Sequence, residues 1–343
     1  MRAVVVPTNG GSDVLELREV DLPAVRPDQV LVDVAAAGVN FIDIYQRGGR
    51  YQIATPFTLG LEGAGTVAAV GSDVADISVG DHVAWKDALG SYAEQVAVRA
   101  DEAIPIPDGV PDDVAAALIL QGLTAHYLAT STYAVQPGDW VVVHAAAGGV
   151  GLLLTQVVKI RGGHVLATTS SEAKAELASK AGADVVTTYD TFVAKARELT
   201  GGDGVPCVFD GVGQATFEAS LDALRPRGLL AMFGAASGPV PPLDVQTLNA
   251  KGSLFLTRPT LAHYTRDRAE LVSRTDDLFG WVKDGSIEVR IGGRYALEDA
   301  RPTTISKAAA PPANSSSPHE NDHVNDANTA LTRHTDRVKQ GRS

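Results

Sequence analysis

Strand-like and helix-like segments alternate along residues 140–234, and this alternation constrains the fold more than any other feature of the chain. The first strand-like segment, WVVVHA (140–145), is a nearly unbroken apolar run. Strands without polar alternation are typical of a sheet that is covered on both faces. The other strand-like segments are 164–170, 184–189, 206–213 and 228–234, and helix-like segments include 150–160 and 172–183. The pattern predicts an α/β fold with a doubly wound parallel sheet.

The first hundred residues have a different residue pattern. Short runs rich in valine and alanine are separated by glycine, proline and aspartate, which is typical of strands joined by turns. These runs are 30–39, 63–71, 81–86 and 92–100. Closely spaced glycines between residues 60 and 80 favour bulges and tight turns, so we expect a curved, barrel-like β-domain. A helix with an acidic start is expected over 112–133, another over 267–283, and a strand over 287–297.

Length and composition restrict the class of protein. A chain of 343 residues is long for one hydrophobic core, so two domains are expected. The net charge of −12 disfavours binding to nucleic acid or anionic lipid. The N-terminus lacks a signal-peptide pattern, and we expect no membrane span. With one cysteine, Cys207, the chain can form no internal disulfide and no cysteine-rich zinc site. These features predict a cytoplasmic protein.

A glycine turn lies between the 140–145 strand and the helix that follows. Residues 146–151 read AAGGVG, which matches the dinucleotide template G-x-G-x-x-G with alanine in the first place. Gly148 would let the backbone approach a pyrophosphate, and Gly151 would let the helix pack closely on the strand. Free amides at the helix start would hold the negative charge. A plain structural turn is the alternative.

The end of the next strand bears on the choice of cofactor. NAD binding calls for an acidic residue about 20 positions after the glycine turn. Here residues 168–171 read TTSS, Lys174 follows, and Tyr189 ends the strand after that. Hydroxyl groups and a cation suit a 2′-phosphate, which favours NADP. The alternative is a solvated lysine and a strand-end tyrosine without a ligand.

A polar group of side chains directly follows the apolar segment 35–39. It consists of Asn40, Asp43, Tyr45 and Tyr51. These residues either close the fold as a polar seam or face a ligand. Tyr45 or Tyr51 could simply stack in the cleft between the expected domains, and Asp43 could cap a turn.

Six motifs follow one another along the chain: GVNFIDIYQRGGRY, GLEGAGTV, GLTAHYLA, VHAAAGGVG, DGVGQATFEASLDALRPRG and KGSLFLTRP. Together they resemble the zinc-independent quinone oxidoreductases of the medium-chain dehydrogenase/reductase superfamily. The resemblance covers residues 1 to about 301. It implies a GroES-like β-rich catalytic domain (1–122, resumed at 263–301), a Rossmann NADP-binding domain (123–262), a homodimer, and NADPH-dependent reduction of quinones or α,β-unsaturated carbonyls.

The resemblance also separates this chain from zinc-dependent relatives. Asn40 stands where those carry a ligating cysteine, and Leu61 stands in the place of a ligating histidine, so only Glu62 remains. Carboxylate alone is a poor ligand set for catalytic zinc, and we expect no metal. His82, His126 and His144 are scattered and are expected to have core or surface roles. Cys207 is expected to be a small core residue.

By the same resemblance, site residues can be assigned. Without a metal, neutral donors would stabilise the charge that develops on the acceptor oxygen. The donors expected to line that space are Asn40, Tyr45, Tyr51 and Thr124. The residues expected to contact NADPH are Asn40, Asp43, Tyr127, Gly148, Gly149, Val150, Gly151, Ser170, Lys174, Tyr189, Phe233, Ser237 and Gly238.

The chain departs from the family pattern after Arg301. Relatives end with a helix and an apolar strand that pairs within the first domain, whereas residues 302–343 are polar and rich in proline. We expect this tail to be disordered and the strand to be missing. A non-catalytic NADPH-binding or structural protein is therefore the alternative function. Residues 253–259 read as an edge strand that could pair with a second copy.

Overall fold

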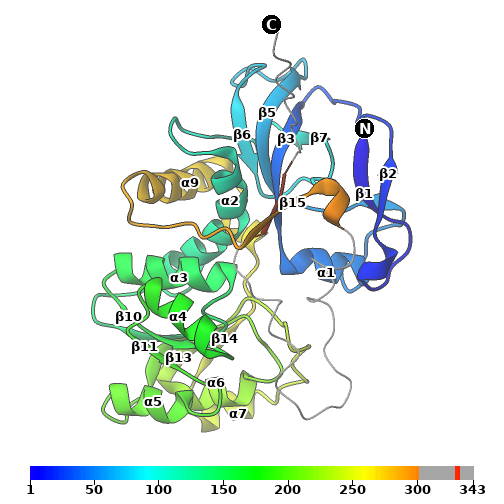
Figure 1. Ribbon diagram of the computed structural model, residues 1–343. Coiled ribbons are helices and arrows are strands. Elements are labelled where there is room, and N and C mark those ends of the chain that lie inside the picture. Colours follow the sequence, from blue (N-terminus) through cyan, green and yellow to red (C-terminus); the bar gives the residue numbers. More distant parts are fainter. Residues whose placement is uncertain (301–328, 333–343) are drawn as a thin grey trace, which may run out of the picture. The chain divides into compact units, whose positions relative to one another are not determined.

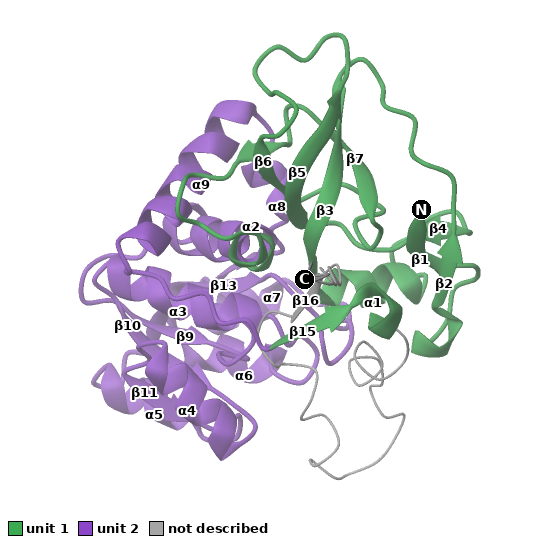
Figure 2. Cartoon of the chain, turned by 45° about the horizontal axis from the view of Figure 1, so that its top comes forward, with its two compact units in different colours: residues 1–117, 293–309, 329–343 green, residues 118–292, 310–328 purple. Residues whose placement is uncertain are grey.

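The computed structural model describes residues 1–300 and 329–332 (Figure 1). The chain divides into two compact units (Figure 2). Unit 1 comprises residues 1–117, 293–309 and 329–343, and unit 2 comprises 118–292 and 310–328. Unit 2 thus also contains residues 263–292, which the sequence assigned to the catalytic domain.

Unit 2 is built on a six-stranded parallel sheet, as the sequence predicted. The strands follow the order β11-β10-β9-β12-β13-β14, which is the doubly wound order of a Rossmann fold. Their bounds are β9 Trp140–Val143, β10 His164–Thr168, β11 Val185–Thr187, β12 Val205–Asp210, β13 Leu224–Met232 and β14 Phe255–Thr257. The central strands carry fully buried valines and leucines because helices cover both faces of the sheet. Cys207 is also buried there, which confirms its predicted core role.

Most helices of unit 2 lie between these strands in the chain, and the last two follow β14. They are α3 Gly149–Ile160, α4 Glu172–Lys180, α5 Phe192–Leu199, α6 Phe217–Ala223, α7 Gln246–Ala250, α8 Leu261–Tyr264 and α9 Arg268–Lys283. Ser171 caps α4, since its side chain accepts a hydrogen bond from the Lys174 amide. Strand β14 stands at one end of the sheet order, as expected for an edge strand.

Unit 1 is the β-rich part of the chain. A three-stranded sheet has the order β2-β1-β4, and a seven-stranded sheet has the order β15-β16-β3-β5-β6-β8, with β7 also paired to β3. The bounds are β1 Arg2–Val6, β2 Glu16–Glu19, β3 Gln29–Val39, β4 Phe57–Thr58, β5 Gly63–Val70, β6 His82–Trp85, β7 Gln95–Arg99, β8 Ile104–Pro105, β15 Gly293–Ala296 and β16 Thr329–Thr332. Short helices are η1 Ser12–Val14, α1 Phe41–Arg47 and η3 Leu297–Ala300. Register shifts in the β3–β5 pair curve the sheet, as the glycine spacing predicted.

The structure differs from the sequence prediction at β16. Thr329–Thr332 lies between β15, with which it is parallel, and β3, with which it is antiparallel. The expectation that no strand follows residue 301 is therefore wrong for these four residues. A strand needs only backbone hydrogen bonds to its neighbours, so the short TALT segment can pair between β15 and β3 although it contains no apolar run. The rest of the predicted disordered tail, 302–343, lies outside the described residues.

Helix α2 (Asp112–Tyr127) continues into a π-helical turn, η2 (Leu128–Thr132). By length and composition the segment 112–132 could cross a bilayer, although no membrane span is expected from the sequence. However, 78% of its most apolar window is buried inside the protein, as in a core helix of a globular fold.

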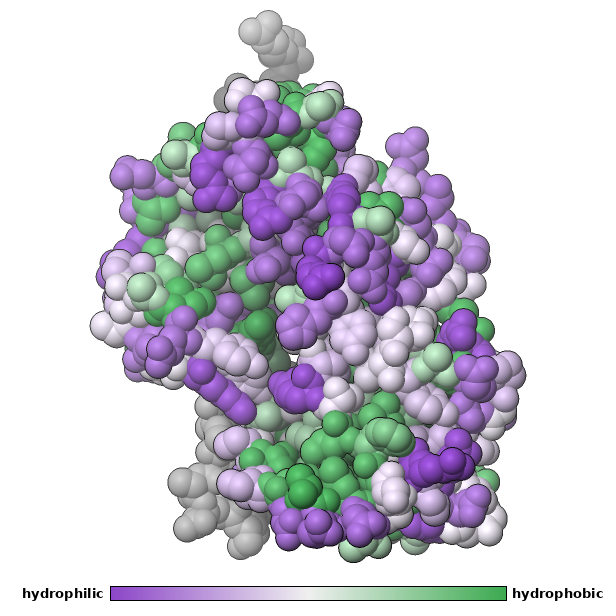
Figure 3. Space-filling view, turned by 180° about the vertical axis from the view of Figure 1, so that it is seen from behind, coloured by the Kyte–Doolittle hydropathy of each residue, from purple (hydrophilic) through white to green (hydrophobic). Residues whose placement is uncertain are grey.

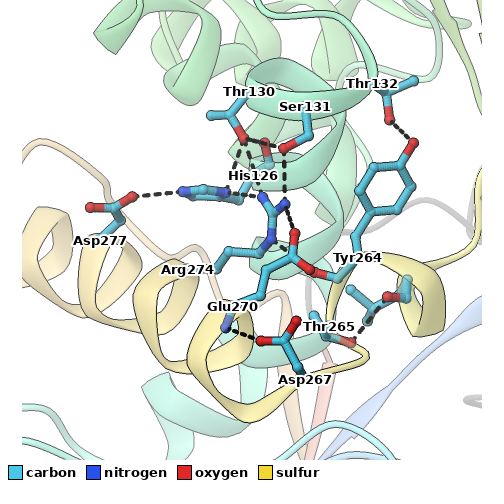
Figure 4. Close-up of polar contacts among 11 residues, drawn as sticks. His126, Thr130, Ser131, Thr132, Tyr264, Thr265, Asp267, Glu270, Arg274 and Asp277 are labelled. Carbon is cyan, nitrogen blue, oxygen red and sulfur yellow. Dashed lines mark hydrogen bonds and ion pairs between the residues drawn. The ribbon is translucent and has the colours of Figure 1, made fainter.

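A polar cluster ties α9 to the end of α2 within unit 2 (Figure 4). Arg274 is buried and donates to His126 Nδ1 at 3.0 Å and to Ser131 Oγ at 2.9 Å, and it pairs with Glu270 Oε1 at 2.5 Å. The other imidazole nitrogen of His126 lies 2.9 Å from Asp277 Oδ2. Burial, aided by the Arg274 charge, lowers the pKa of His126. These contacts explain why residues 263–292 belong to unit 2.

Candidate active site

The predicted phosphate turn forms between β9 and α3. Gly148 is the extended N-cap of α3, with φ −75°, and Gly149 is its first residue. A Cβ on Gly151 would lie 2.4 Å from the Ala145 carbonyl oxygen and 2.7 Å from Ala146 Cα, so only glycine permits this approach of helix and strand. The first amides of α3 have no partner within the helix, and Gly148, Gly149 and Val150 are half-buried. The turn can therefore cradle an anion.

Two aromatic side chains support this turn. The Tyr189 hydroxyl accepts a hydrogen bond from the Ala145 amide at 3.2 Å, which holds a non-glycine residue at φ +50°. His144 is fully buried, with its ring nitrogens 2.8 Å from Thr168 Oγ1 and 3.0 Å from Ser220 Oγ. Burial lowers the pKa of His144, so the imidazole is neutral near pH 7. This confirms the predicted core role of His144.

Lys174 and Ser170 come together at the carboxyl end of β10. Lys174 is buried although it carries a charge, and its Nζ lies 3.3 Å from Ser170 Oγ. The pair lies just past the strand next to β9, where a dinucleotide's ribose lies in Rossmann folds. A cation and a hydroxyl at this point can hold a 2′-phosphate.

Two further loops meet at the same edge of the sheet. Asp210, the last residue of β12, accepts hydrogen bonds from the amides of Val212 at 2.7 Å and Gly213 at 3.0 Å. Ser237 Oγ donates to the Val212 carbonyl at 2.8 Å and accepts from the Ala215 amide at 2.9 Å. The loop after β13 that carries Phe233, Ser237 and Gly238 is thus joined to the loop after β12. The role of Asp210 in holding this loop was not predicted from the sequence. The Asp-Gly dipeptide at the end of a predicted strand could have indicated it.

The two predicted site residues on α2 have partners within unit 2. The Thr124 hydroxyl donates to the Leu120 carbonyl at 2.8 Å, so its proton is used inside the helix. The Tyr127 ring is buried and stacks on Tyr264, with ring centroids 4.3 Å apart. Burial also raises the pKa of Tyr127. The predicted ligand contacts of both residues stay predictions.

In unit 1, Asn40 and Asp43 form a capping box at the start of α1. The Asn40 amide donates to Asp43 Oδ2 at 2.8 Å, and the Asp43 amide donates to the Asn40 carbonyl at 3.1 Å. The Tyr92 hydroxyl also donates to Asp43 Oδ2 at 2.6 Å. Asp43 therefore has the capping role that was left open in the sequence, whereas its contact with NADPH stays a prediction.

Burial is the largest influence on the pKa of Asp43 at the start of α1. The Asp43 carboxyl is fully buried, and the loss of hydration raises its pKa to about 6, although the hydrogen bonds from Tyr92 and Asn40 oppose the shift. The Asn40 side-chain amide donates to Glu62 Oε1 at 2.5 Å. Glu62 is fully buried and orients the Asn40 side chain. Neither Tyr92 nor this use of Glu62 was foreseen, because the partners are far apart in the chain.

Tyr45 and Tyr51 lie together in an aromatic cluster, which we define as Phe41, Tyr45 and Tyr51. The Tyr45 and Tyr51 ring centroids are 5.6 Å apart and the rings are nearly perpendicular, and the Phe41 and Tyr45 centroids are 5.1 Å apart. The Arg50 guanidinium lies over the Tyr45 ring, 4.6 Å from its centroid. The two rings therefore pack on each other, and Tyr51 still exposes 43% of its surface. Whether either ring stacks in a cleft between the domains stays a prediction.

Side chains that could bind a metal ion are not clustered in the part of the chain that the structure describes. Over residues 1–300 and 329–332, no three His, Cys, Asp or Glu side chains gather as a possible metal site. His82 is exposed and lies 2.9 Å from Asp112 Oδ1, and His126 belongs to the α9 cluster.

Two family models match the chain. Residues 26–108 match the alcohol dehydrogenase GroES-like domain, and residues 149–272 match the zinc-binding dehydrogenase family. These matches agree with the β-rich unit 1 and the parallel sheet of unit 2.

Individual proteins are similar over most of the chain. The quinone oxidoreductase of Pseudomonas aeruginosa is 43% identical over 295 residues, which cover 85% of this chain and 91% of the relative. The 2-haloacrylate reductase of a Burkholderia species is 39% identical, covering 87% and 92%. The structure of Escherichia coli quinone oxidoreductase complexed with NADPH is similar with a TM-score of 0.89 and 36% identity, covering 97% of this chain and all of that one.

Proposed function

The chain belongs to the quinone oxidoreductases of the medium-chain dehydrogenase/reductase superfamily, and from this membership we propose that it binds NADPH and reduces quinones. The observation that carries the proposal is the glycine turn at Gly148–Gly151 with the Lys174–Ser170 pair at the end of the neighbouring strand. The turn suits a pyrophosphate, and the pair suits a 2′-phosphate, which NADPH carries and NADH lacks.

The residues of unit 2 fit this cofactor. Only glycine is possible at position 151, and the buried Lys174 ammonium lies beside a hydroxyl. When bound, NADPH supplies a hydride from its nicotinamide ring. Tyr189 would hold the turn in place, and the loop that carries Phe233, Ser237 and Gly238 would line the same edge of the sheet.

The negative charge that develops on the acceptor oxygen requires hydrogen-bond donors, and for this role we propose Asn40, Tyr45, Tyr51 and Thr124. Glu62 orients the Asn40 side-chain amide, which would donate an N–H to the acceptor oxygen. The phenols of Tyr45 and Tyr51 lie together in the aromatic cluster and can donate or relay a proton through water. The Thr124 hydroxyl would have to exchange its bond to Leu120 before it could donate. Solvent would then supply the proton that completes the hydroquinone.

We propose that this chemistry needs no zinc. At the positions where zinc-dependent relatives carry a ligating cysteine and histidine, this chain has the Asn40 amide and the Leu61 alkyl group. Neither is among the usual protein ligands of zinc. Glu62 is committed to Asn40 within the buried corner. Metal analysis of the purified protein tests the point, and stoichiometric zinc with activity lost on chelation would contradict it.

A second acceptor class has a specific observation in its favour. The Burkholderia relative is named 2-haloacrylate reductase, and haloacrylate is an α,β-unsaturated acid. We therefore include α,β-unsaturated carbonyl compounds among the proposed acceptors. The alternative of a non-catalytic NADPH-binding protein rested on a missing strand, and β16 removes that premise. A cytoplasmic location stays a prediction from composition.

We further propose a homodimer formed through β14. This edge strand exposes Phe255 and Leu256, and Val245 before it is also exposed. Figure 3 shows an apolar area in the lower part of the view, over unit 2. An unpaired strand edge with apolar side chains can pair with its symmetry mate in a second copy. Sedimentation velocity would give twice the mass of one chain.

The acceptor role is tested by NADPH oxidation with a small quinone. We expect Asn40→Ala to lower kcat by about 10²-fold, the cost of one preorganised donor, and Tyr51→Phe to lower it about ten-fold. NADPH affinity, measured by fluorescence titration, should stay within a few-fold. Tyr295→Phe, which removes a phenol from β15 of the same unit, is the control and should keep full turnover. Unchanged turnover in both variants would remove these donors from the mechanism.

A further inference from the structure

We propose that Tyr264 is a positioning residue for the cofactor, because it holds the Tyr127 ring on the side of the sheet where the nicotinamide half of NADPH would bind. The inference rests on the proposed function, since it takes NADPH to lie along the carboxyl edge of the unit 2 sheet. It adds a residue that the sequence did not single out, and it divides the site into two halves that can be tested separately.

Tyr264 lies on the side of the sheet where the second half of the cofactor is expected. In a doubly wound sheet, a dinucleotide spans the point where the strand order reverses, which here is between β9 and β12. The glycine turn follows β9 and the Lys174–Ser170 pair follows β10, so these parts suit the pyrophosphate and the adenosine half. The nicotinamide half would then lie on the side of β12 and β13. Tyr264 ends α8, which residues 258–260 join to the carboxyl end of β14, the neighbour of β13.

The Tyr264 ring lies flat against the ring of Tyr127, the last residue of α2. The ring centroids are 4.3 Å apart and the ring planes differ by 9°. Arg258, directly after β14, donates to the Met232 carbonyl at the end of β13. The charge of Arg258 also acts on the Tyr127 phenol, where it opposes the rise in pKa that burial causes. The Tyr127 phenol therefore lies near the carboxyl ends of β13 and β14.

The hydroxyl of Tyr127 is available to a ligand. The ring is buried, and a buried tyrosine hydroxyl usually has a hydrogen-bond partner. Among the residues that the structure describes, none forms a hydrogen bond with the Tyr127 hydroxyl. A bound cofactor at this edge of the sheet would supply the partner, provided that the ring is held in place.

Tyr264 is itself fixed at three points by residues of η2 and α9 (Figure 4). Arg274 Nε donates to the Tyr264 carbonyl at 2.9 Å, and the guanidinium lies 5.9 Å from the centroid of the Tyr264 ring, within cation–π range. The Thr132 hydroxyl donates to the Tyr264 phenol oxygen at 3.0 Å. Thr132 ends the π-helical turn η2, and such turns are frequent at functional sites. Because α8 has only four residues, these contacts rather than the helix hold the Tyr264 side chain.

Arg274 is fully committed to this arrangement. It is buried, and all three of its guanidinium nitrogens donate hydrogen bonds within unit 2, to Tyr264, His126, Thr130, Ser131 and Glu270. Burying a cation costs free energy unless the cation is paired and hydrogen-bonded. An apolar side chain could join α9 to α2 as well, but it could not hold the Tyr264 carbonyl.

The test measures the affinity of the full chain for NADPH and for adenosine 2′,5′-bisphosphate, which carries the 2′-phosphate but no nicotinamide. Fluorescence titration gives the first affinity and calorimetry gives the second. Tyr264→Leu should weaken NADPH binding about five-fold, the worth of one stacked aromatic pair, because Tyr127 loses its support. Binding of the bisphosphate should stay unchanged, since this ligand reaches only the side of β9 and β10. Tyr264→Phe keeps the ring and should restore NADPH affinity.

Two matched variants separate positioning from a general loss of structure. Trp140→Leu removes another aromatic stack, which Trp140 forms with His164 at 4.9 Å at the amino ends of β9 and β10, and it should change neither affinity. Lys174→Ala should weaken the binding of both ligands, because both carry the 2′-phosphate. Thermal unfolding of each variant shows that it is folded at the temperature of the titration.

A double variant tests whether Tyr264 acts through Tyr127. Tyr127→Leu should weaken NADPH binding at least as much as Tyr264→Leu does. The double variant should bind NADPH no more weakly than Tyr127→Leu alone, because the two residues act as one unit. Additive losses would mean that Tyr264 acts on the cofactor without Tyr127, and this result would overturn the positioning role.

The outcomes separate this inference from the proposed function. Equal losses for NADPH and the bisphosphate in Tyr264→Leu would mean a general loss of structure, and unchanged NADPH affinity would mean that the stack does not support the cofactor. Either result overturns the inference while NADPH binding and quinone reduction stand. A wild-type chain that does not bind NADPH would overturn both.

Discussion

Gly151→Ala tests the phosphate turn most directly, because the new methyl group would collide with backbone atoms. The added Cβ would lie 2.4 Å from the Ala145 carbonyl oxygen and 2.7 Å from Ala146 Cα. Backbone on β9 and the turn cannot rotate away as a side chain could. We therefore expect a cost near the upper end for overpacking, about 3 kcal/mol.

The helix can relieve this overlap only by moving away from the strand, which also displaces the amides that would hold the pyrophosphate. For a domain of the size of unit 2, about 3 kcal/mol corresponds to a fall in Tm of about 6–12 °C. Displaced amides should weaken NADPH binding by at least about ten-fold. Thermal unfolding and NADPH fluorescence titration measure the two effects on the same sample.

Gly280→Ala is the matched control. Gly280 lies inside α9, and a Cβ there would meet no atom within 4 Å. The change should therefore raise stability by up to about 1 kcal/mol through helix propensity, with NADPH affinity unchanged. A Gly151→Ala protein that melts with the wild type and binds NADPH equally well would refute the packing argument.

Two further predictions concern charged groups. Lys174→Ala should weaken NADPH binding about ten- to hundred-fold, because it removes a charged hydrogen-bond donor, and should leave NADH binding unchanged. Lys180→Ala, at the exposed end of α4, is the control and should change neither affinity. Equal losses of affinity for both nucleotides would mean that Lys174 is merely structural. The pKa of Asp43 is about 6 in the folded protein and 3.8 in the free group, so the folded state holds the proton more tightly. The protonated carboxyl therefore stabilises the fold at low pH, and this stabilisation is lost as the pH rises from about 4 through 6. Two pKa units correspond to about 3 kcal/mol. Urea unfolding at pH 4 and pH 7 should show that Asp43→Asn lacks this loss, and a parallel pH dependence in both proteins would contradict the assignment.

Local patterns in the chain were enough to predict most of the secondary structure. The parallel strands of unit 2 and the glycine turn follow from neighbouring residues in the chain, where periodicity and turn chemistry act. Strand β16 escaped this reasoning because TALT has no apolar run, and its place depends on the two strands that flank it. The position of α9 was also missed, since Arg274 meets His126 across nearly 150 residues.

The sequence by itself determined the fold class and the glycine turn between β9 and α3, because hydrophobic period and glycine spacing are local properties. Only the tertiary structure decided which polar residues are enclosed and which are exposed. It buried Asp43 beneath Tyr92 and joined Asn40 to Glu62, and it left Arg50 exposed over Tyr45. Burial changes the free energy of a charged group by several kcal/mol, and burial is a property of the packed chain rather than of any segment of it.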